Sequence, residues 1–205
     1  EIGVRLVGSE MCIRDSSPAL LNLIFGSQIT FYAFLFAPIV LVMIISSKIN
    51  SLSASMASFL FFVYSAVTGV TLSAIFLMYT QESIATTFGI TAGTFGATAL
   101  FGYVTKKDLS KMGSILFMLL IGLIIASVVN MFLKNDTMMW ILTYVGIVIF
   151  VGLTAYDMQK LKKIAHSIDD DESSIAKFAV LGALTLYLDF INLFLRLLQI
   201  FGKKR

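Results

Sequence analysis

Charged residues are scarce in this chain of 205 residues, and so are cysteine, histidine and proline. Charged residues make up 13% of the sequence, whereas a soluble domain carries about 25%. The single cysteine, Cys12, excludes a disulfide framework and a cysteine-based metal site, and the single histidine, His166, excludes a site built from several histidines of one chain. These absences argue against a soluble enzyme, a disordered chain and a disulfide scaffold.

Apolar residues take the place of the missing charge. They form 58% of the sequence, and the mean hydropathy is +0.93. Six apolar segments reach the length of about 20 residues at which a helix crosses a bilayer: 28–47, 56–79, 84–104, 112–133, 138–158 and 175–201. None of them alternates as the strands of a membrane barrel do. The sequence therefore predicts an all-α polytopic membrane protein.

The first sixteen residues, EIGVRLVGSEMCIRDS, differ from the rest of the chain. They contain no apolar span and do not follow the layout of a signal peptide. The string resembles a translated sequencing adaptor. We therefore expect residues 1–16 to be a non-native, unstructured leader that stands in place of a native first helix, and residues 17–205 to form a single transmembrane domain.

Basic residues are distributed unevenly over the predicted loops. The loops 48–55, 105–111 and 159–174 carry seven Lys residues, whereas the loops 80–83 and 134–137 carry one. Cytoplasmic loops of membrane proteins are enriched in Lys and Arg. This rule places the first set in the cytoplasm and explains the formal charge of +3 without a nucleic-acid partner. The length of segment 175–201 favours a full crossing, although basic residues follow it.

Two aspartates and one arginine lie within or at the end of predicted spans. Asp189 is near the middle of the last segment, Arg196 follows two turns later on the same face, and Asp157 closes the fifth segment. A charged side chain at the centre of a membrane span costs about 2.5–3.5 kcal/mol on insertion scales, so such residues are functional candidates. The simpler alternatives are a protonated packing residue for Asp189 and a solvated helix end for Asp157.

If Asp157 packs against Asp189, the two carboxylates cannot both ionise at low cost and would share a proton. Such a pair would act as a pH-sensitive latch between two helices, and it would attract a cation once both protons are lost. Other polar features are weaker candidates. The acidic run Asp169–Glu172 lacks the ligand pattern of an EF-hand loop, and His166 has no partner in sequence. Gly89 and Gly93 have the spacing of close helix packing.

Several motifs together resemble the Bax inhibitor-1 family (the transmembrane Bax inhibitor motif family). They are FVGLTAYD at 150–157 followed by MQKLK at 158–162, and LGALTLYLDFINLF at 181–194. The motifs TGVTLS at 68–73 and GYVTKKDLS at 102–110 resemble the bacterial branch of this family. The resemblance covers about residues 18–202, and the motif around Asp189 is the most specific part.

The resemblance implies a seven-helix bundle with the last helix central, of which six spans are present here. It also implies a pH-sensitive calcium leak channel of the bacterial inner membrane that serves calcium homeostasis. In that reading, Asp157 and Asp189 form the proton-sharing pair on the ion pathway and are the candidate calcium ligands. Lys48 and Arg196 are candidate countercharges. Tyr156, Tyr187 and Asn192 are expected to be supporting polar residues. Calcium and protons would be the permeant species, and no cofactor is expected.

Two other functions remain open at this point. Bacterial relatives in the family include a modulator of a membrane-bound AAA protease, so the chain can also be a non-conducting regulator that binds a protease or another membrane protein. The Tyr156–Asp157 pair resembles one half of the pattern of intramembrane aspartyl proteases. In those enzymes glycines surround the second aspartate, whereas Tyr187 and Leu188 precede Asp189 here. We therefore predict that the protein is not an enzyme.

Overall fold

A computed structural model describes residues 37, 40–45, 47–48, 52–166 and 172–204. The predicted leader 1–16, most of the predicted span 28–47 and the acidic residues 169–171 lie outside the described residues. The described part of the chain is built from helices in the order α4 (Ala54–Met78), α5 (Gln81–Val104), α6 (Ser110–Leu133), α7 (Asp136–Ala165) and α8 (Glu172–Phe201). The prediction of an all-α fold is confirmed.

Four of these helices are long and apolar enough to cross a membrane: α5, α6, α7 and the part Ile175–Phe201 of α8. Helix α4 has 25 residues and coincides with the predicted span 56–79, and within its described residues the apolar stretch is Ser55–Val70. These helices confirm a polytopic membrane protein. The spans predicted at 84–104, 112–133, 138–158 and 175–201 fall on the four helices.

Polar residues in the short connections define where the helices begin. The Ser53 hydroxyl accepts a hydrogen bond from the Met56 amide at 3.3 Å at the start of α4. The Asn135 side chain accepts one from the Met138 amide at 2.9 Å at the start of α7. Such N-caps satisfy amides that have no partner in the first turn of a helix. Lys134 ends α6 in the left-handed conformation, with φ 50°, so α6 and α7 are joined by a tight turn.

Helix α7 extends beyond the predicted span. The predicted span ended at Met158 and assigned the following lysines to a loop, whereas the helix continues to Ala165. The apolar pattern marks the part of a helix that lies in hydrocarbon, and it does not mark the point where the helix ends. Gln and Lys are good helix formers, so Gln159–Ala165 continue the helix beyond the apolar segment.

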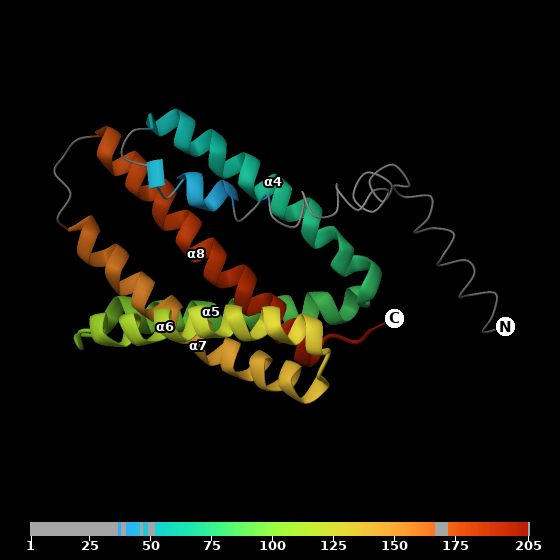
Figure 1. Ribbon diagram of the computed structural model, residues 1–205. Helices are drawn as coiled ribbons and strands as arrows, with labels where there is room; N and C mark the ends of the chain where they lie inside the picture. Colours follow the sequence, from blue (N-terminus) through green and yellow to red (C-terminus); the bar gives the residue numbers. More distant parts are fainter. Residues whose placement is uncertain (1–36, 38–39, 46, 49–51, 167–171, 205) are drawn as a thin grey trace.

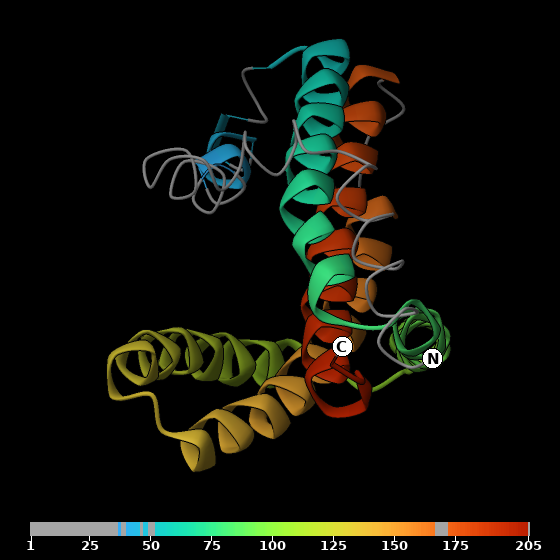
Figure 2. The ribbon, with the colours of Figure 1, turned by 90° about the vertical axis from the view of Figure 1, so that its right-hand side faces the viewer.

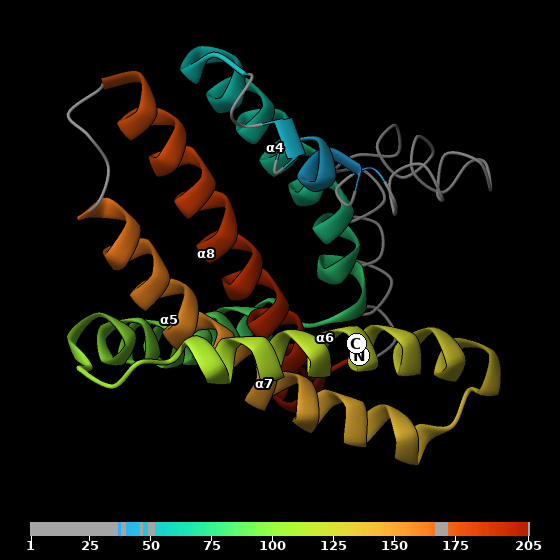
Figure 3. The same cartoon turned by 60° about the vertical axis from the view of Figure 1, so that its left-hand side comes forward.

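Helices α7 and α8 together occupy the centre of the described fold. Helix α7 packs against α5, α6 and α8, and α8 packs against α4, α5 and α7. Helices α4 and α8 run alongside each other, while α5 and α6 run across their direction (Figures 1 and 3). Figure 2 shows α6 extending away from the α4–α8 pair. The expected central position of the last helix is therefore shared with α7.

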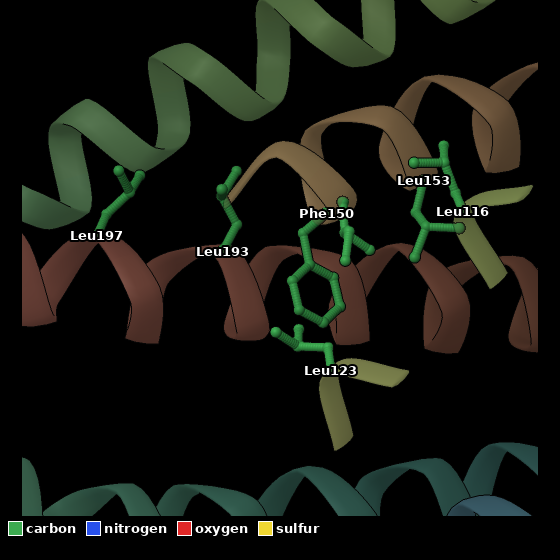
Figure 4. Packing of buried hydrophobic residues seen from close by; sticks show 7 residues of the cluster. Leu116, Leu123, Phe150, Leu153, Leu193 and Leu197 are labelled. Atoms are coloured by element: carbon green, nitrogen blue, oxygen red, sulfur yellow. The ribbon is translucent and has the colours of Figure 1, made fainter. Parts of the chain in front are cut away.

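An apolar cluster joins α6, α7 and α8. Its buried members are Leu116 and Leu123 from α6, Ile149, Phe150 and Leu153 from α7, and Leu193 and Leu197 from α8. Figure 4 shows the Phe150 ring directed towards Leu123, with Leu116 and Leu153 beside each other. This packing sets how α7 and α8 lie against each other on the segments that carry Asp157 and Asp189.

Many large apolar side chains outside this core point away from the protein. Phe132 is 77% exposed, and Phe117 and Val148 are also exposed. Exposed apolar side chains in such number are expected where lipid replaces water. Trp140 and Tyr144 are exposed and stack with ring centroids 6.1 Å apart near the start of α7, as aromatic residues at a membrane interface do.

The C-terminal residues lie at the end of the fold away from the lysine-rich loops. The Thr80 amide, between α4 and α5, donates a hydrogen bond to the Lys203 carbonyl at 3.0 Å. At the opposite end, the Lys163 ammonium lies 2.6 Å from the Asp108 carboxylate and joins the end of α7 to the α5–α6 loop. Because α8 is continuous over 30 residues between these two ends, it agrees with a full crossing.

The close approach of α5 to α7 depends on Gly102. A Cβ at this position would overlap the backbone of Ala155, so only glycine allows the two helices to meet there. Gly89 and Gly93, for which close packing was predicted, have no described atom within 4 Å of such a Cβ. Within the described residues the packing prediction for Gly89 and Gly93 is wrong, because these glycines lie on the exposed face of α5.

We predict that Gly102→Ala destabilises the protein by about 1–3 kcal/mol, the usual effect of overpacking a filled interface. Gly93→Ala is the matched control on the same helix, where the added methyl group meets open space and should not destabilise. Thermal unfolding in detergent measures both variants. Equal unfolding temperatures for the two variants would contradict the α5–α7 contact.

Candidate functional site

A polar stripe runs along α8. Its members follow one another at intervals of three or four residues, which places them on one face of a helix: Thr185, Asp189, Asn192, Arg196 and Gln199. Each of these side chains lines at least one of two cavities, and Arg196 lines both. The stripe therefore gives α8 one polar face in an otherwise apolar segment.

The first cavity has a volume of about 990 Å³ and lies between α6, α7 and α8. Most of its wall is apolar, with Phe117, Leu120 and Ile124 of α6 among the lining residues. The polar side chains of the α8 stripe from Thr185 to Arg196 face it, as do Asp157 and Lys160 of α7. An apolar cavity with a few converging polar groups is the usual form of a binding site.

The carboxyl groups of Asp157 and Asp189 meet on the wall of this cavity. They lie close enough to form a hydrogen bond with each other, which two carboxyl groups can do only if one of them carries a proton. Asp189 is 5% exposed and Asp157 is half-buried. The buried Oδ2 atom of Asp189 has no hydrogen-bond donor among the described residues. This arrangement suits one proton held between two acceptors on different helices.

Two of the predicted supporting residues line the same cavity as the aspartate pair. Tyr156 and Asn192 both face it. The ring of Tyr156 packs where Gly113 of α6 has no side chain, because a Cβ there would lie 2.5 Å from the ring. The Asn192 amide donates to the Leu188 carbonyl of its own helix at 2.8 Å. The structure therefore brings Asp157, Asp189, Tyr156 and Asn192 together.

Arg196 lies where the first cavity meets a second one. The second cavity has a volume of about 370 Å³ and is lined at the α6–α7 turn by Asn130, Lys134 and Asp136, among others. Arg196 lines both cavities. The Arg196 side chain passes α7 at Gly146, where a Cβ would lie 3.0 Å from Arg196 Nε. Arg196 therefore places a positive charge between the aspartate pair and the opposite end of the fold.

Two predicted site residues lie elsewhere. The ring of Tyr187 packs against Tyr64 of α4, with centroids 5.7 Å apart, in an apolar cluster that also contains Leu184. Lys48 is exposed in the helical residues that precede α4, and it is not among the residues that line either cavity. Neither residue is therefore brought to the aspartate pair in this structure.

Sequence reasoning missed Thr185 and Gln199. The Thr143 hydroxyl of α7 donates to Gln199 Oε1 at 2.7 Å, so Gln199 also ties α8 to α7 at the wall of the second cavity. The helical period of polar residues on α8 was the signal that could have identified both. Within the described residues, no three His, Cys, Asp or Glu side chains come together as a metal cluster, so any cation at the aspartate pair would meet two carboxylates.

Comparison with known proteins gives consistent matches. The profile of the family described as "Bax1-I: Inhibitor of apoptosis-promoting Bax1" matches residues 6–205. "Inner membrane protein YbhL" of Escherichia coli (strain K12) is 50% identical over 205 residues, which cover 100% of this chain and 88% of that protein. A protein of Borreliella burgdorferi is 49% identical over 183 residues, which cover 89% of this chain and 79% of that protein. A membrane protein of Streptococcus pyogenes is 34% identical over 202 residues, which cover 98% of this chain and 87% of that protein.

The contact between the two carboxyl groups predicts a measurable energetic coupling. In a double-mutant cycle at acidic pH, Asp157→Ala and Asp189→Ala should be coupled by about 0.5–1.5 kcal/mol, the range for one hydrogen bond in a membrane protein. Thermal unfolding of the four proteins in detergent gives the coupling. Additive effects, within about 0.3 kcal/mol, would show that the pair shares no hydrogen bond.

Proposed function

The chain belongs to the Bax inhibitor-1 family of membrane proteins, and we propose that it provides a pH-sensitive calcium leak across the inner membrane. The proton sensor in this proposal is the pair Asp157 and Asp189. The proposal rests on one observation. The two carboxyl groups meet on the wall of the first cavity, which lies between membrane helices and is lined by the polar stripe of α8. Ionisable residues within membrane helices are costly to insert, so a carboxyl pair between two such helices indicates a functional site.

At acidic pH the pair holds a proton. The hydrogen bond between the carboxyl groups then links α7 to α8, and the site carries at most one negative charge. Arg196, about 10 Å farther along α8 at the usual rise per residue, sits between the two cavities. Its positive charge opposes the passage of a divalent cation. In this state the leak is small.

At alkaline pH the shared proton is lost. Two carboxylates then face each other in a medium of low dielectric constant, where like charges repel strongly. The link between α7 and α8 breaks, and the two negative charges attract a divalent cation. Both effects act in the same direction, so the calcium leak rises as pH rises through the titration of the pair.

The α8 stripe supplies the path along which the ion moves. Thr185 and Asn192 present polar groups on the two sides of Asp189, and Gln199 continues the stripe into the second cavity. From Thr185 to Gln199 the stripe covers about 21 Å along the helix axis, which is most of a hydrocarbon core of about 30 Å. A continuous polar face of this length favours conduction over a role in which α8 is merely a packing element.

We predict that Asp189→Asn abolishes the pH dependence of calcium flux, because an amide cannot take up or release the proton. Asp157→Asn should weaken the pH dependence in the same direction, to a smaller extent. Flux into dye-loaded liposomes, from mildly acidic to mildly alkaline pH, measures the effect. Glu82→Gln, which removes one carboxylate outside both cavities, is the matched control.

An Asp189→Asn variant with an unchanged pH profile would refute the sensor. If the wild-type protein gives no flux at any pH, conduction itself is refuted. The alternative is then a regulator that binds another membrane protein such as a membrane-bound protease, and cross-linking in native membranes would identify that partner.

Arg196 generates a second prediction. Arg196→Gln should raise the calcium flux severalfold at acidic pH, because it removes the positive charge between the two cavities, whereas Arg196→Lys should keep the flux low. Lys203→Gln, which removes one positive charge outside both cavities, serves as the control in the same liposome assay. A flux that falls in Arg196→Gln would contradict a barrier role and indicate that Arg196 supports the fold.

A further inference from the structure

Gln159 holds the α5–α6 loop in a defined shape. Its side chain is 6% exposed. Its Nε2 atom donates a hydrogen bond to the Lys107 carbonyl at 2.7 Å, and its Oε1 atom accepts one from the Leu109 amide at 2.9 Å. A buried amide that satisfies both a donor and an acceptor of a loop fixes the backbone between them. The loop residues Lys106 and Lys107 are therefore presented by a rigid support.

This loop and the end of α7 enclose a pocket of about 390 Å³, here called the basic pocket. It is lined by Thr105, Lys106, Lys107, Asp108, Gln159, Lys162, Lys163 and His166. Among the described lining residues four lysines face one aspartate, so these residues carry a formal charge of +3 with His166 neutral. The positive-inside rule places this end of the fold at the cytoplasmic surface.

The charges within the basic pocket have different roles. The Lys163 ammonium pairs with the Asp108 carboxylate, and this hydrogen bond, together with one from the Ser110 hydroxyl, lowers the pKa of Asp108 to about 2. Lys162 donates to the Tyr103 carbonyl at 2.8 Å and lies over the Tyr103 ring. Both contacts hold the wall of the pocket together. Lys106 and Lys107 are exposed and supply the charge that an anionic ligand would meet.

An apolar groove adjoins the basic pocket. It has a volume of about 310 Å³ and runs between α7 and α8, with Met158, Leu161, Phe178, Gly182 and Ala183 in its lining. Tyr103 lines the groove, and Lys162 lines both the groove and the basic pocket. Val104, directly before the loop, is 59% exposed on α5. The basic pocket therefore continues, past Lys162, into an apolar groove between α7 and α8.

We propose that the basic pocket and the adjoining groove form a binding site for an anionic phospholipid of the cytoplasmic leaflet. Lys106 and Lys107 contact the headgroup phosphate, and one acyl chain lies in the groove beside Ala183. Basic pockets between membrane helices on the cytoplasmic side are suited to anionic headgroups. A free phosphate ion would use the lysines alone, whereas a lipid uses the lysines and the groove together.

Native mass spectrometry of the full chain tests this site. The protein is purified in detergent with phosphatidylglycerol or phosphatidylcholine of the same acyl chains, and retained lipid is counted. We expect preferential retention of phosphatidylglycerol. The double variant Lys106→Gln/Lys107→Gln should bind it roughly tenfold or more weakly, the effect of removing two lysine charges near an anionic surface. The control Lys203→Gln/Lys204→Gln removes the same charge from the opposite end and should bind as the wild type does.

Two further arms separate a lipid from a small anion. Ala183→Phe fills the groove at an exposed position and should weaken retention of phosphatidylglycerol while leaving the lysines in place. The water-soluble headgroup glycerophosphoglycerol, which has no acyl chains, should compete poorly. The proposal would be overturned if both lipids were retained equally, or if the two double variants lost phosphatidylglycerol to the same extent. Full displacement of phosphatidylglycerol by the free headgroup would also overturn it, in favour of a small-anion site.

Discussion

The carboxyl group of Asp189 can stay in the interior of a membrane helix pair only if it is neutral or paired, and the centre of the structure is arranged around this requirement. The group is almost completely buried, and its partner is the carboxyl group of Asp157 on the adjacent helix. In the proposed mechanism, a single proton satisfies both groups through one hydrogen bond. The apolar cluster of α6, α7 and α8 holds the two helices so that the carboxyl groups meet. The packing that stabilises the fold is therefore also what brings the two carboxyl groups together.

The amino-acid sequence was sufficient for the class of fold, and it placed Asp157 and Asp189 among the candidates that the structure brings to one cavity. Apolar runs of membrane length have few interpretations in a chain with so little charge, and the described helices agree with them. Asp189 and Arg196 were predicted to share a face from their spacing, and both line the first cavity. The position of Asp157 fits a solvated helix end equally well, so its role in the pair was a hypothesis that rested on the family resemblance.

The contacts between helices were harder to predict from the sequence. They depend on which faces of two helices meet, and the residue pattern of one helix does not show which face its neighbour contacts. Gly102 and Gly93 look alike in sequence, yet only Gly102 faces a helix within the described residues. Gln159 followed an apolar span and looked like an ordinary loop residue, whereas it holds a loop some fifty positions earlier in the chain. The position of Tyr187 was within reach of sequence reasoning. It precedes Asp189 by two residues, about 200° around a helix, and it packs against α4 rather than facing the cavity.

In the proposed mechanism, a proton shared by Asp157 and Asp189 restrains the leak, and the loss of this proton releases it. Infrared spectroscopy of the reconstituted protein detects a protonated carboxyl group by its C=O band, and calcium flux can be followed in the same vesicles. We expect one such band that is absent in Asp189→Asn. In the wild-type protein the band should disappear, as pH rises, over the same interval in which the flux increases. A flux that changes with pH while this band stays constant would show that the shared proton does not control the leak.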